Sequence, residues 1–417
     1  MSSNGLDVRN LNMRIAQIAP PWLPIPPKNY GGTENVLYNL VEAQVAQGHD
    51  VTLFAPGDAR TSAKLVSFFP RSLIEDGIPW TMHLKAYYHL HKAVEQIKEQ
   101  SFDIVHTHLS SSADMYVFPL TASLATPHVT TLHSHFPFDR DARTGKIGDA
   151  DSYYMEWAPD VPTIAISESA RKEEGALFPL NFIGVVHNGI SMREYYRVKA
   201  PRGDYFVWLG RFMPEKGAHL AIEAAKRAKV PLILAGIIDR HAKVSMDYFY
   251  EVIKPQIGSE QISYIGPVNV NQKMHLFSRA RGFLNPIEWE EPFGMVMIEA
   301  MSQGCPVISF ARGAAPEIVA DQVSGFLVRT VDEMVERISQ IDTIDRDAVR
   351  MHFERNFSAR VMAEKYTEVY KQVIQMSRNV TPSELSPTNG GIIKSPALGK
   401  PKVSPPRMLP SSTLSAQ

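Results

Sequence analysis

Short apolar runs, each followed by a turn and a helical pattern, recur along this chain and constrain its fold more than any other feature. The first unit consists of an apolar run over residues 14–19, a proline-rich loop over 20–30 and a helical pattern that ends at Gly48. Apolar residues recur in that pattern at helical spacing. Repeated strand-then-helix units are typical of a parallel sheet covered by helices. The sequence therefore predicts an α/β protein.

The pattern restarts at residue 206, after a polar and basic stretch that contains Pro201. The predicted strands of the first series are 14–19, 51–55, 104–108, 128–133, 163–167 and 184–187, and those of the second are 206–210, 232–235, 262–265, 282–285 and 306–309. We predict two doubly wound Rossmann-like domains, over 13–198 and 199–357. Such sheets bind ligands at the carboxyl ends of their strands, so we expect a cleft between the two domains there.

The two ends of the chain differ from this pattern. Residues 1–12 are polar and are predicted to be flexible, and a helix is predicted over 358–378. Residues 381–417 contain seven prolines and seven serines with few large apolar groups. Because such a segment buries too little apolar surface to offset the entropy lost on ordering, a disordered tail is predicted over 379–417. A partner-binding arm is the alternative interpretation of this tail.

Charge and cysteine content exclude several classes of function. Lys plus Arg (43) and Asp plus Glu (44) give a net charge of −1, so no global basic field attracts nucleic acid. The single cysteine, Cys305, cannot form an internal disulfide or a cysteine-based metal finger. There is no signal-peptide pattern and no run of eighteen apolar residues. We expect a cytoplasmic protein without a transmembrane segment, and leave peripheral membrane association open.

The commonest motifs of nucleotide and hydrolase chemistry are missing. The sequence has no GxxxxGK[ST], no GxGxxG after the first strand, no HExxH and no GxSxG. Three loops after second-domain strands remain informative. The first carries Arg211 and Lys216 at a strand-to-helix turn, where two cations and a helix N-terminus suit a diphosphate. Two solvated surface charges are the alternative.

The second loop holds two glutamates eight positions apart. Glu291 precedes a helix predicted over 295–303, and Glu299 lies just over one turn inside it. One carboxylate can meet a ligand's hydroxyls and the other a ribose diol, while amides at Gly294 point at phosphate. The alternative is that Glu291 caps the helix and Glu299 is a solvated surface residue. The third loop, 312–317, is either a close backbone approach to a ligand or a plain turn into a helix capped by Glu317.

The first domain contributes two histidine pairs and a glycine-rich helix start. His106 and His108, and His133 and His135, stand at predicted strand ends, with each pair on one face of the sheet. A metal site, hydrogen bonding to a sugar and a structural role are all open interpretations. The sequence GGTE over 31–34 is either an amide-rich ligand loop or a plain N-cap turn.

These motifs together resemble a known family. The stretch EPFGMVMIEAMSQGCPVI over 291–308 resembles the signature of the retaining glycosyltransferases of family four, which have the GT-B fold. Similar elements follow in the same order: GGTE at 31–34, GHDV at 48–51, DIVH at 103–106, ISE at 166–168, NG at 188–189, GR at 210–211, KG at 216–217 and PE at 316–317. The resemblance covers roughly residues 13–376. It departs from the family pattern at Ser191, and at Ala314 and Ala315.

The resemblance implies a role for each matching residue. Arg211 and Lys216 are expected to bind the donor diphosphate, and Glu299 the ribose hydroxyls. Glu291 is expected to contact the transferred hexose. His133 is expected beside the sugar at the reaction centre. Donor-binding amides are expected at Gly31, Gly32, Gly294 and Met295, and the last helix is expected to cross back onto the first domain.

The activity implied is transfer of a hexose, with retention, from a UDP- or GDP-linked sugar to a carbohydrate, lipid-linked or small-molecule acceptor. It would need no metal or other cofactor and would serve glycan, polysaccharide or glycolipid synthesis. A nucleotide-sugar epimerase, a sugar phosphorylase or an inactive sugar-nucleotide-binding or partner-binding protein are the alternatives. Arg140, Arg143 and Lys146 leave an acidic or lipid-phosphate acceptor open, beside a role as solvated loop charges.

Overall fold

The first half of the chain builds a seven-stranded, fully parallel sheet. The computed structural model describes residues 12–28, 31–139, 146, 148–240, 242–258 and 261–379. The strands are β1 (Arg14–Ile18), β2 (Asp50–Phe54), β3 (Lys64–Val66), β4 (Ile104–Leu109), β5 (His128–Leu132), β6 (Pro162–Ala165) and β7 (Asn181–Val185). Their order is β3-β2-β1-β4-β5-β6-β7. The helices are α1 (Gly32–Ala46), α2 (His83–Lys98), α3 (Val117–Thr121), α4 (Ala150–Tyr154) and α5 (Glu168–Leu177), with short 3₁₀ turns at Ser112–Tyr116 and Ala158–Asp160.

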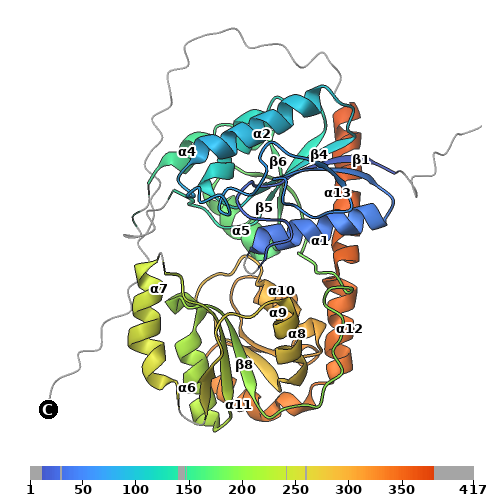
Figure 1. Ribbon diagram of the computed structural model, residues 1–417. Helices are drawn as coiled ribbons and strands as arrows, with labels where there is room; N and C mark the ends of the chain where they lie inside the picture. Colours follow the sequence, from blue (N-terminus) through green and yellow to red (C-terminus); the bar gives the residue numbers. More distant parts are fainter. Residues whose placement is uncertain are drawn as a thin grey trace, which may run out of the picture. The chain divides into compact units, whose positions relative to one another are not determined.

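The second half builds a second α/β domain that contains β8 and α6–α11 (Figure 1). Its six-stranded parallel sheet has the order β10-β9-β8-β11-β12-β13. Its strands are β8 (Phe206–Arg211), β9 (Leu232–Ile237), β10 (Ile262–Tyr264), β11 (Gly282–Asn285), β12 (Val307–Phe310) and β13 (Gly325–Val328). Its helices are α6 (Ala218–Ala228), α7 (Lys243–Asp247), α8 (Val270–Arg279), α9 (Met295–Ser302), α10 (Ala315–Ile318), α11 (Val331–Gln340) and α12 (Arg346–Asn356). Shorter helical turns span Pro214–Lys216, Tyr248–Ile253, Lys254–Gln256 and Ile341–Thr343. Both predicted doubly wound sheets are therefore confirmed.

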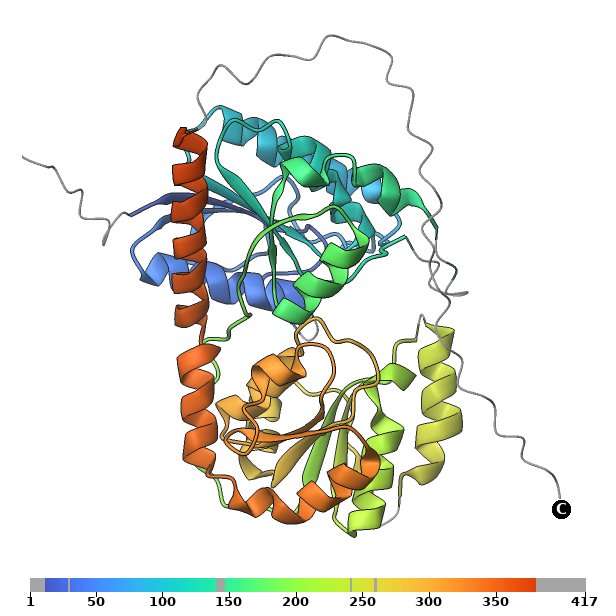
Figure 2. The same cartoon turned by 180° about the vertical axis from the view of Figure 1, so that it is seen from behind.

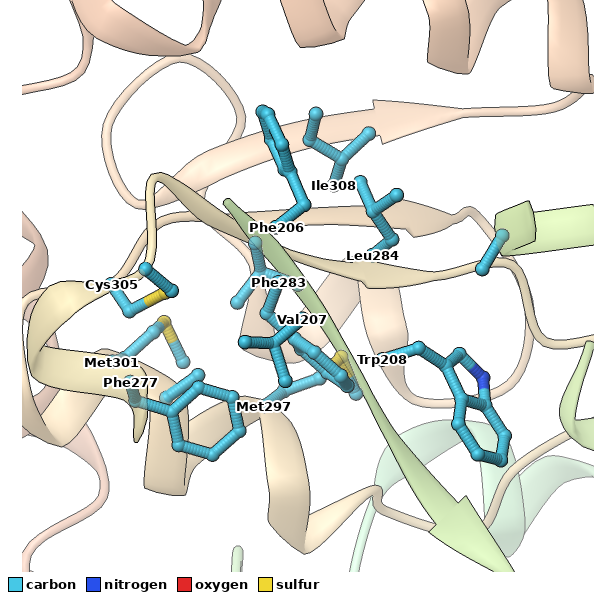
Figure 3. Close-up of a cluster of buried hydrophobic side chains, with 14 of the residues drawn as sticks. Phe206, Val207, Trp208, Phe277, Phe283, Leu284, Met297, Met301, Cys305 and Ile308 are labelled. Atoms are coloured by element: carbon cyan, nitrogen blue, oxygen red, sulfur yellow. The ribbon is translucent and has the colours of Figure 1, made fainter. Parts of the chain in front are cut away.

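The core of the second domain packs strand side chains against α8 and α9. Phe206, Val207, Phe283 and Ile308 are fully buried, and Phe277 of α8 packs edge-on against Phe283 with ring centroids 5.6 Å apart (Figure 3). Cys305 is buried in the same cluster, and burial raises the pKa of its thiol to about 12. Because a thiol is nucleophilic only as a thiolate, the structure gives this cysteine a packing role.

The last helix, α13 (Ala359–Asn379), packs against the first sheet although it follows the second (Figure 2). Its apolar and tyrosine side chains at Met362, Ala363, Tyr366, Val369, Tyr370 and Val373 belong to the core cluster of the first sheet. The predicted crossing back is therefore confirmed. The described residues up to Ser377 form one compact unit. The predicted division at 198/199 falls between β7 and β8 and stays a prediction.

Strand prediction was wrong in three places. The sequence missed β3, which has only three residues, and β13, which follows a tight turn at Gln322 with φ 62°. The strand predicted over 184–187 is β7, Asn181–Val185, whose pairing with β6 contains a register shift.

The predicted flexible N-terminus, apart from residue 12, and the predicted tail beyond residue 379 lie outside the described residues, as do Arg140 and Arg143. Within the described ranges, no helix has both the length and the apolar character needed to cross a bilayer.

Candidate functional site

The loop after β8 brings Lys216 against the loop after β11. A 3₁₀ turn over Pro214–Lys216 is followed by Gly217, which has φ 70° and is the N-cap residue of α6. A Cβ at Gly217 would stand 1.9 Å from the carbonyl oxygen of Pro286, so only glycine allows this close approach. The two loops are also joined by a backbone hydrogen bond from the Glu288 amide to the Glu215 carbonyl, 2.8 Å long.

Lys216 is held between a carboxylate and an aromatic ring. Its ammonium pairs with Glu291 and lies 4.7 Å from the ring centroid of Trp289. The Trp289 Nε1–H in turn donates to Glu291 Oε2 over 2.9 Å. The side chains of Lys216 and Glu291 are only 22% and 16% exposed, so the reading of Lys216 as a solvated charge is wrong. The side chain of Arg211, at the end of β8, is 40% exposed, and its Nη1 lies 4.0 Å from Asp239 Oδ2.

The helix that carries Glu299 begins at a glycine without a capping side chain. Gly294 has φ 89° and precedes Met295, the first residue of α9, and no side chain caps this end. The proposal that Glu291 caps this helix is therefore wrong. Backbone N–H groups of such a first turn lack intrahelical partners and can meet an anion. Met295 packs against the core clusters of both sheets.

Glu299 is buried, so the reading of a solvated surface residue is also wrong. It is 5% exposed, pairs with Lys273 of α8, and accepts a 2.9 Å hydrogen bond from the Tyr195 hydroxyl. Burial, and then the Glu299 charge, raise the pKa of Tyr195 well above its usual value, so it acts only as a neutral donor. Asn35, in the first turn of α1, also hydrogen-bonds to Tyr195. No local sequence signal links Tyr195 or Lys273 to Glu299, because each lies on a separate element.

The start of α1 combines two glycines that differ in their steric role. Gly31 has φ 157°, and a Cβ there would stand 2.8 Å from Cβ of Pro27. A Cβ at Gly32 would meet nothing within 4 Å, so Gly32 leaves open space at the first position of the helix. No side chain caps this end. Glu34, in the first turn, is 5% exposed, and its burial raises the pKa of its carboxyl to about 7.

The histidines of the first sheet have separate environments. His133 directly follows β5 and hydrogen-bonds through Nε2 to His108 Nδ1 over 2.9 Å. Burial lowers the pKa of His133 to about 3, so it is neutral near pH 7. His106 lies inside β4, not at its end as predicted, and bonds to Tyr370 of α13. Over the described stretches, no group of three or more His, Cys, Asp or Glu side chains is placed to hold a metal ion.

His135 connects the first sheet to the loop that carries Glu291. Its Nδ1 contacts Glu174 over 2.7 Å and its Nε2 contacts the Glu290 carbonyl oxygen over 2.9 Å. Burial opposes the charged form, but the hydrogen bond to Glu174 and the nearby carboxylates outweigh it and raise the pKa of His135. A hollow of about 590 Å³ lies here, lined by the segment after β5, by α5 with Glu173, and by Trp289 and Glu290. The sequence singled out His135 but not Glu174.

The third loop has a linking role that the sequence did not predict. One of the two interpretations of this loop had Glu317 cap its own helix, but its carboxylate accepts hydrogen bonds from the Glu168 and Ser169 amides, 2.8 and 2.7 Å long. It also accepts one from His187 Nε2 over 2.9 Å. Burial raises the pKa of Glu317, but these hydrogen bonds outweigh it and lower that pKa overall. Glu317 thus caps the N-terminus of α5, on the first sheet.

Two family models match the chain in succession. Residues 30–194 match the model described as Glycosyltransferase Family 4, and residues 197–356 match the model described as Glycosyl transferases group 1. The GGTE helix start lies within the first match, and Arg211, Lys216 and the Glu291–Glu299 loop lie within the second. The chain belongs to the family-four glycosyltransferases. The resemblance stated from the motifs is confirmed.

Two curated relatives of this glycosyltransferase are similar over most of their length. The O-antigen chain mannosyltransferase C of Escherichia coli is 25% identical, with 87% of this chain and 99% of the relative covered. The phosphatidyl-myo-inositol mannosyltransferase of Mycolicibacterium smegmatis (strain ATCC 700084 / mc(2)155) is 23% identical, with 88% and 94% covered.

Solved structures confirm the GT-B fold of this family-four glycosyltransferase. AviGT4, a glycosyltransferase involved in avilamycin A biosynthesis, is 21% identical with a TM-score of 0.61, and the match covers 87% of this chain and 98% of that one. Anabaena HepE, solved in complex with UDP-glucose, is 17% identical with a TM-score of 0.63, and the match covers 86% and 100%. At these identities the likeness establishes the fold alone.

Proposed function

We propose that this glycosyltransferase transfers a hexose from a UDP- or GDP-linked sugar to an acceptor hydroxyl, with retention at the anomeric carbon and without a divalent metal. The observation that carries the proposal is the convergence of Lys216, Glu291 and Trp289, with the exposed Arg211 at the start of the loop that carries Lys216. This arrangement supplies cations for a diphosphate and a carboxylate for sugar hydroxyls at one strand edge. The mannosyltransferase names of two relatives favour a hexose, and the HepE complex favours a nucleotide sugar.

The residues at this edge suit the charge that develops during transfer. The bond from the anomeric carbon to the diphosphate oxygen breaks, and the acceptor oxygen bonds to that carbon on the same face. The acceptor proton passes to the leaving phosphate oxygen, so no protein base is consumed. Arg211 and Lys216 would stabilise the departing diphosphate, as preorganised cations do in other sites. Lys216 would exchange its partner Glu291 for phosphate, which frees Glu291 to bind the hexose.

Other site residues would hold the donor in place. Glu299 is fixed by Lys273 and Tyr195 and would bind the ribose hydroxyls. The first turn of α9, at Gly294 and Met295, and the start of α1, at Gly31 and Gly32, would present backbone amides to phosphate. His133 would meet a sugar hydroxyl. Positioning of this kind accounts for a large share of catalysis when the chemistry needs no covalent protein intermediate.

Substitution of the two cations tests the proposal. We expect Lys216→Ala and Arg211→Ala each to lower the rate of sugar transfer about 10²–10³-fold, because each removes one charge from the leaving diphosphate. Lys226→Ala, at the exposed far end of α6, is the matched control and is expected to keep its activity. Initial rates of nucleotide release over a panel of acceptors, with and without EDTA, measure this. Full activity in either site variant, or loss of activity in EDTA, would contradict the proposed roles.

A further inference from the structure

A continuous chain of buried hydrogen bonds runs from α13 to His133. It starts at the Tyr370 hydroxyl, which lies 3.2 Å from Gln17 Nε2 and 3.1 Å from Gln44 Nε2. Gln17 Nε2 also lies 3.0 Å from Gln44 Oε1. Gln17 Oε1 then contacts His108 Nε2 over 2.9 Å, and His108 Nδ1 contacts His133 Nε2 over 2.9 Å. Gln17, Gln44, His108 and Tyr370 are at most 1% exposed, so water does not compete for these groups.

The single proton of the Tyr370 hydroxyl determines which groups donate and which accept along this chain of hydrogen bonds. With both amide groups donating to the Tyr370 oxygen, the single Tyr370 proton goes to His106 Nδ1, 2.7 Å away. All contacts around the tyrosine are then satisfied. His106 Nε2–H donates to Thr131 Oγ1 over 2.7 Å, and the threonine lies 3.0 Å from the Tyr366 hydroxyl.

The reversed direction forms one hydrogen bond fewer and leaves one buried oxygen–oxygen contact without a proton. If the side-chain amide of Gln17 were flipped, its oxygen would face both the Gln44 amide and the Tyr370 hydroxyl. Gln44 would then have to turn as well in order to donate to it, and two amide oxygens would face the Tyr370 oxygen. A hydroxyl carries one proton and donates to only one of them, so the other amide oxygen meets the Tyr370 oxygen with no proton between them. Because this lost hydrogen bond lies in a buried network, we expect the first direction to be favoured by about tenfold.

We propose that Tyr370, acting through Gln17 and His108, fixes His133 as the tautomer with a protonated Nε2 and a bare Nδ1, which accepts a hydrogen bond from a ligand hydroxyl. In the favoured direction Gln17 Oε1 accepts from His108 Nε2–H, so neutral His108 has a bare Nδ1. That nitrogen accepts from His133 Nε2–H. The other ring nitrogen of His133 makes no hydrogen bond to any described residue, and His133 remains 8% exposed.

This inference rests on the proposed function for the identity of the ligand, and it narrows the ligand's chemistry. A bare, neutral imidazole nitrogen needs a partner that brings its own proton. A sugar hydroxyl meets that condition, whereas a phosphate or carboxylate oxygen does not. Tyr370, Gln17 and His108 are positioning residues, since they act on the ligand only through His133.

The nitrogen resonances of the histidine rings test this assignment directly. In the ¹⁵N-histidine-labelled full chain at pH 7, with His133 assigned through His133→Gln, we expect a protonated Nε2 and a bare Nδ1. In Tyr370→Phe both directions form the same number of amide–amide bonds, so we expect a mixture of the two His133 tautomers. Tyr366→Phe is the matched control, because this residue is one turn away on the same helix and its hydroxyl hydrogen-bonds to Thr131, at the far end of the network. It is expected to keep the single tautomer.

The outcomes separate this inference from the proposed function. A protonated Nδ1 on His133 in the wild-type chain would overturn the inference, whether or not the variants fold. A single unchanged tautomer in folded Tyr370→Phe would overturn the role of the tyrosine. On addition of UDP-glucose or GDP-mannose, we expect the Nδ1 resonance to shift while Nε2 stays protonated. If neither nucleotide sugar binds, the proposed function is contradicted while the ring assignment of the free protein still stands or falls by its own spectrum.

Discussion

Lys216 shows how a single side chain is prepared for an anion before the anion arrives. It is an ammonium stacked over Trp289 and paired with Glu291, so its position is set by two partners from a different loop. Sequence spacing identified Lys216 and Glu291 as candidates, because both follow strands whose carboxyl ends share one edge of the sheet. Their mutual contact could not be predicted, since 75 residues separate them in the chain. The same holds for the Glu299 partners Lys273 and Tyr195.

The buried carboxyl group of Glu34 predicts how the stability of the fold depends on pH. Burial, reinforced by the charge of Asp114, raises the pKa of Glu34 from 4.5 to about 7. Between pH 4.5 and 7 the folded chain therefore keeps a proton on Glu34 that the unfolded chain has already released. Stability falls as pH rises through this window, and above pH 7 the loss reaches about 3 kcal/mol.

Glu34→Gln should remove this loss. We expect the free energy of unfolding of the variant to rise relative to that of the wild type as pH is raised from 5 to 8, as measured by urea unfolding at both pH values. Glu99→Gln, at the exposed end of α2, is the control and is expected to follow the wild type. Identical pH dependence in wild type and Glu34→Gln would show that this carboxyl does not change its protonation on folding.

Among the elements, the strand-to-helix turn after β8 depends on a close approach of two backbone segments. The sequence indicated it by a glycine following a cation, and the structure adds that the backbone of Pro286 fills the space beside Gly217. Central strands such as β1 and β8 could be predicted because they are rich in apolar residues, most of which are buried. The edge strand β3 was missed and the bounds of β7 were misplaced, since most of their residues are partly exposed and carry a weaker pattern.

Gly217→Ala tests whether this turn depends on the close approach. We expect it to destabilise the fold by more than the roughly 1–2 kcal/mol that a left-handed conformation alone costs, because the new methyl group meets a backbone carbonyl. Gly77→Ala is the control: φ there is 72°, but a Cβ meets nothing within 4 Å. Equal losses in the two variants, measured by chemical denaturation, would refute the steric argument.

At the scale of the whole molecule, a few polar contacts join the two sheets near the candidate site. His135 meets the Glu290 carbonyl, Ser167 donates to the Pro292 carbonyl over 2.7 Å, and Glu317 caps α5. The loops of Arg211, Lys216 and Glu291 belong to the second sheet, whereas His133 and the glycines at 31 and 32 belong to the first. The fold class was predictable from the repeated units, but these contacts were not, because each pairs residues from distant loops.

The most direct test of this account is a thermal-shift measurement with UDP-, GDP-, ADP- and dTDP-sugars. A ligand at 100 times its dissociation constant adds about 2.7 kcal/mol of stability to the folded state. We predict that a UDP- or GDP-sugar raises the Tm of the wild type and of Lys226→Ala, and that Arg211→Ala loses this response. If no nucleotide sugar raises the Tm, or if Arg211→Ala responds as the wild type does, the assignment of a donor diphosphate to this site is contradicted.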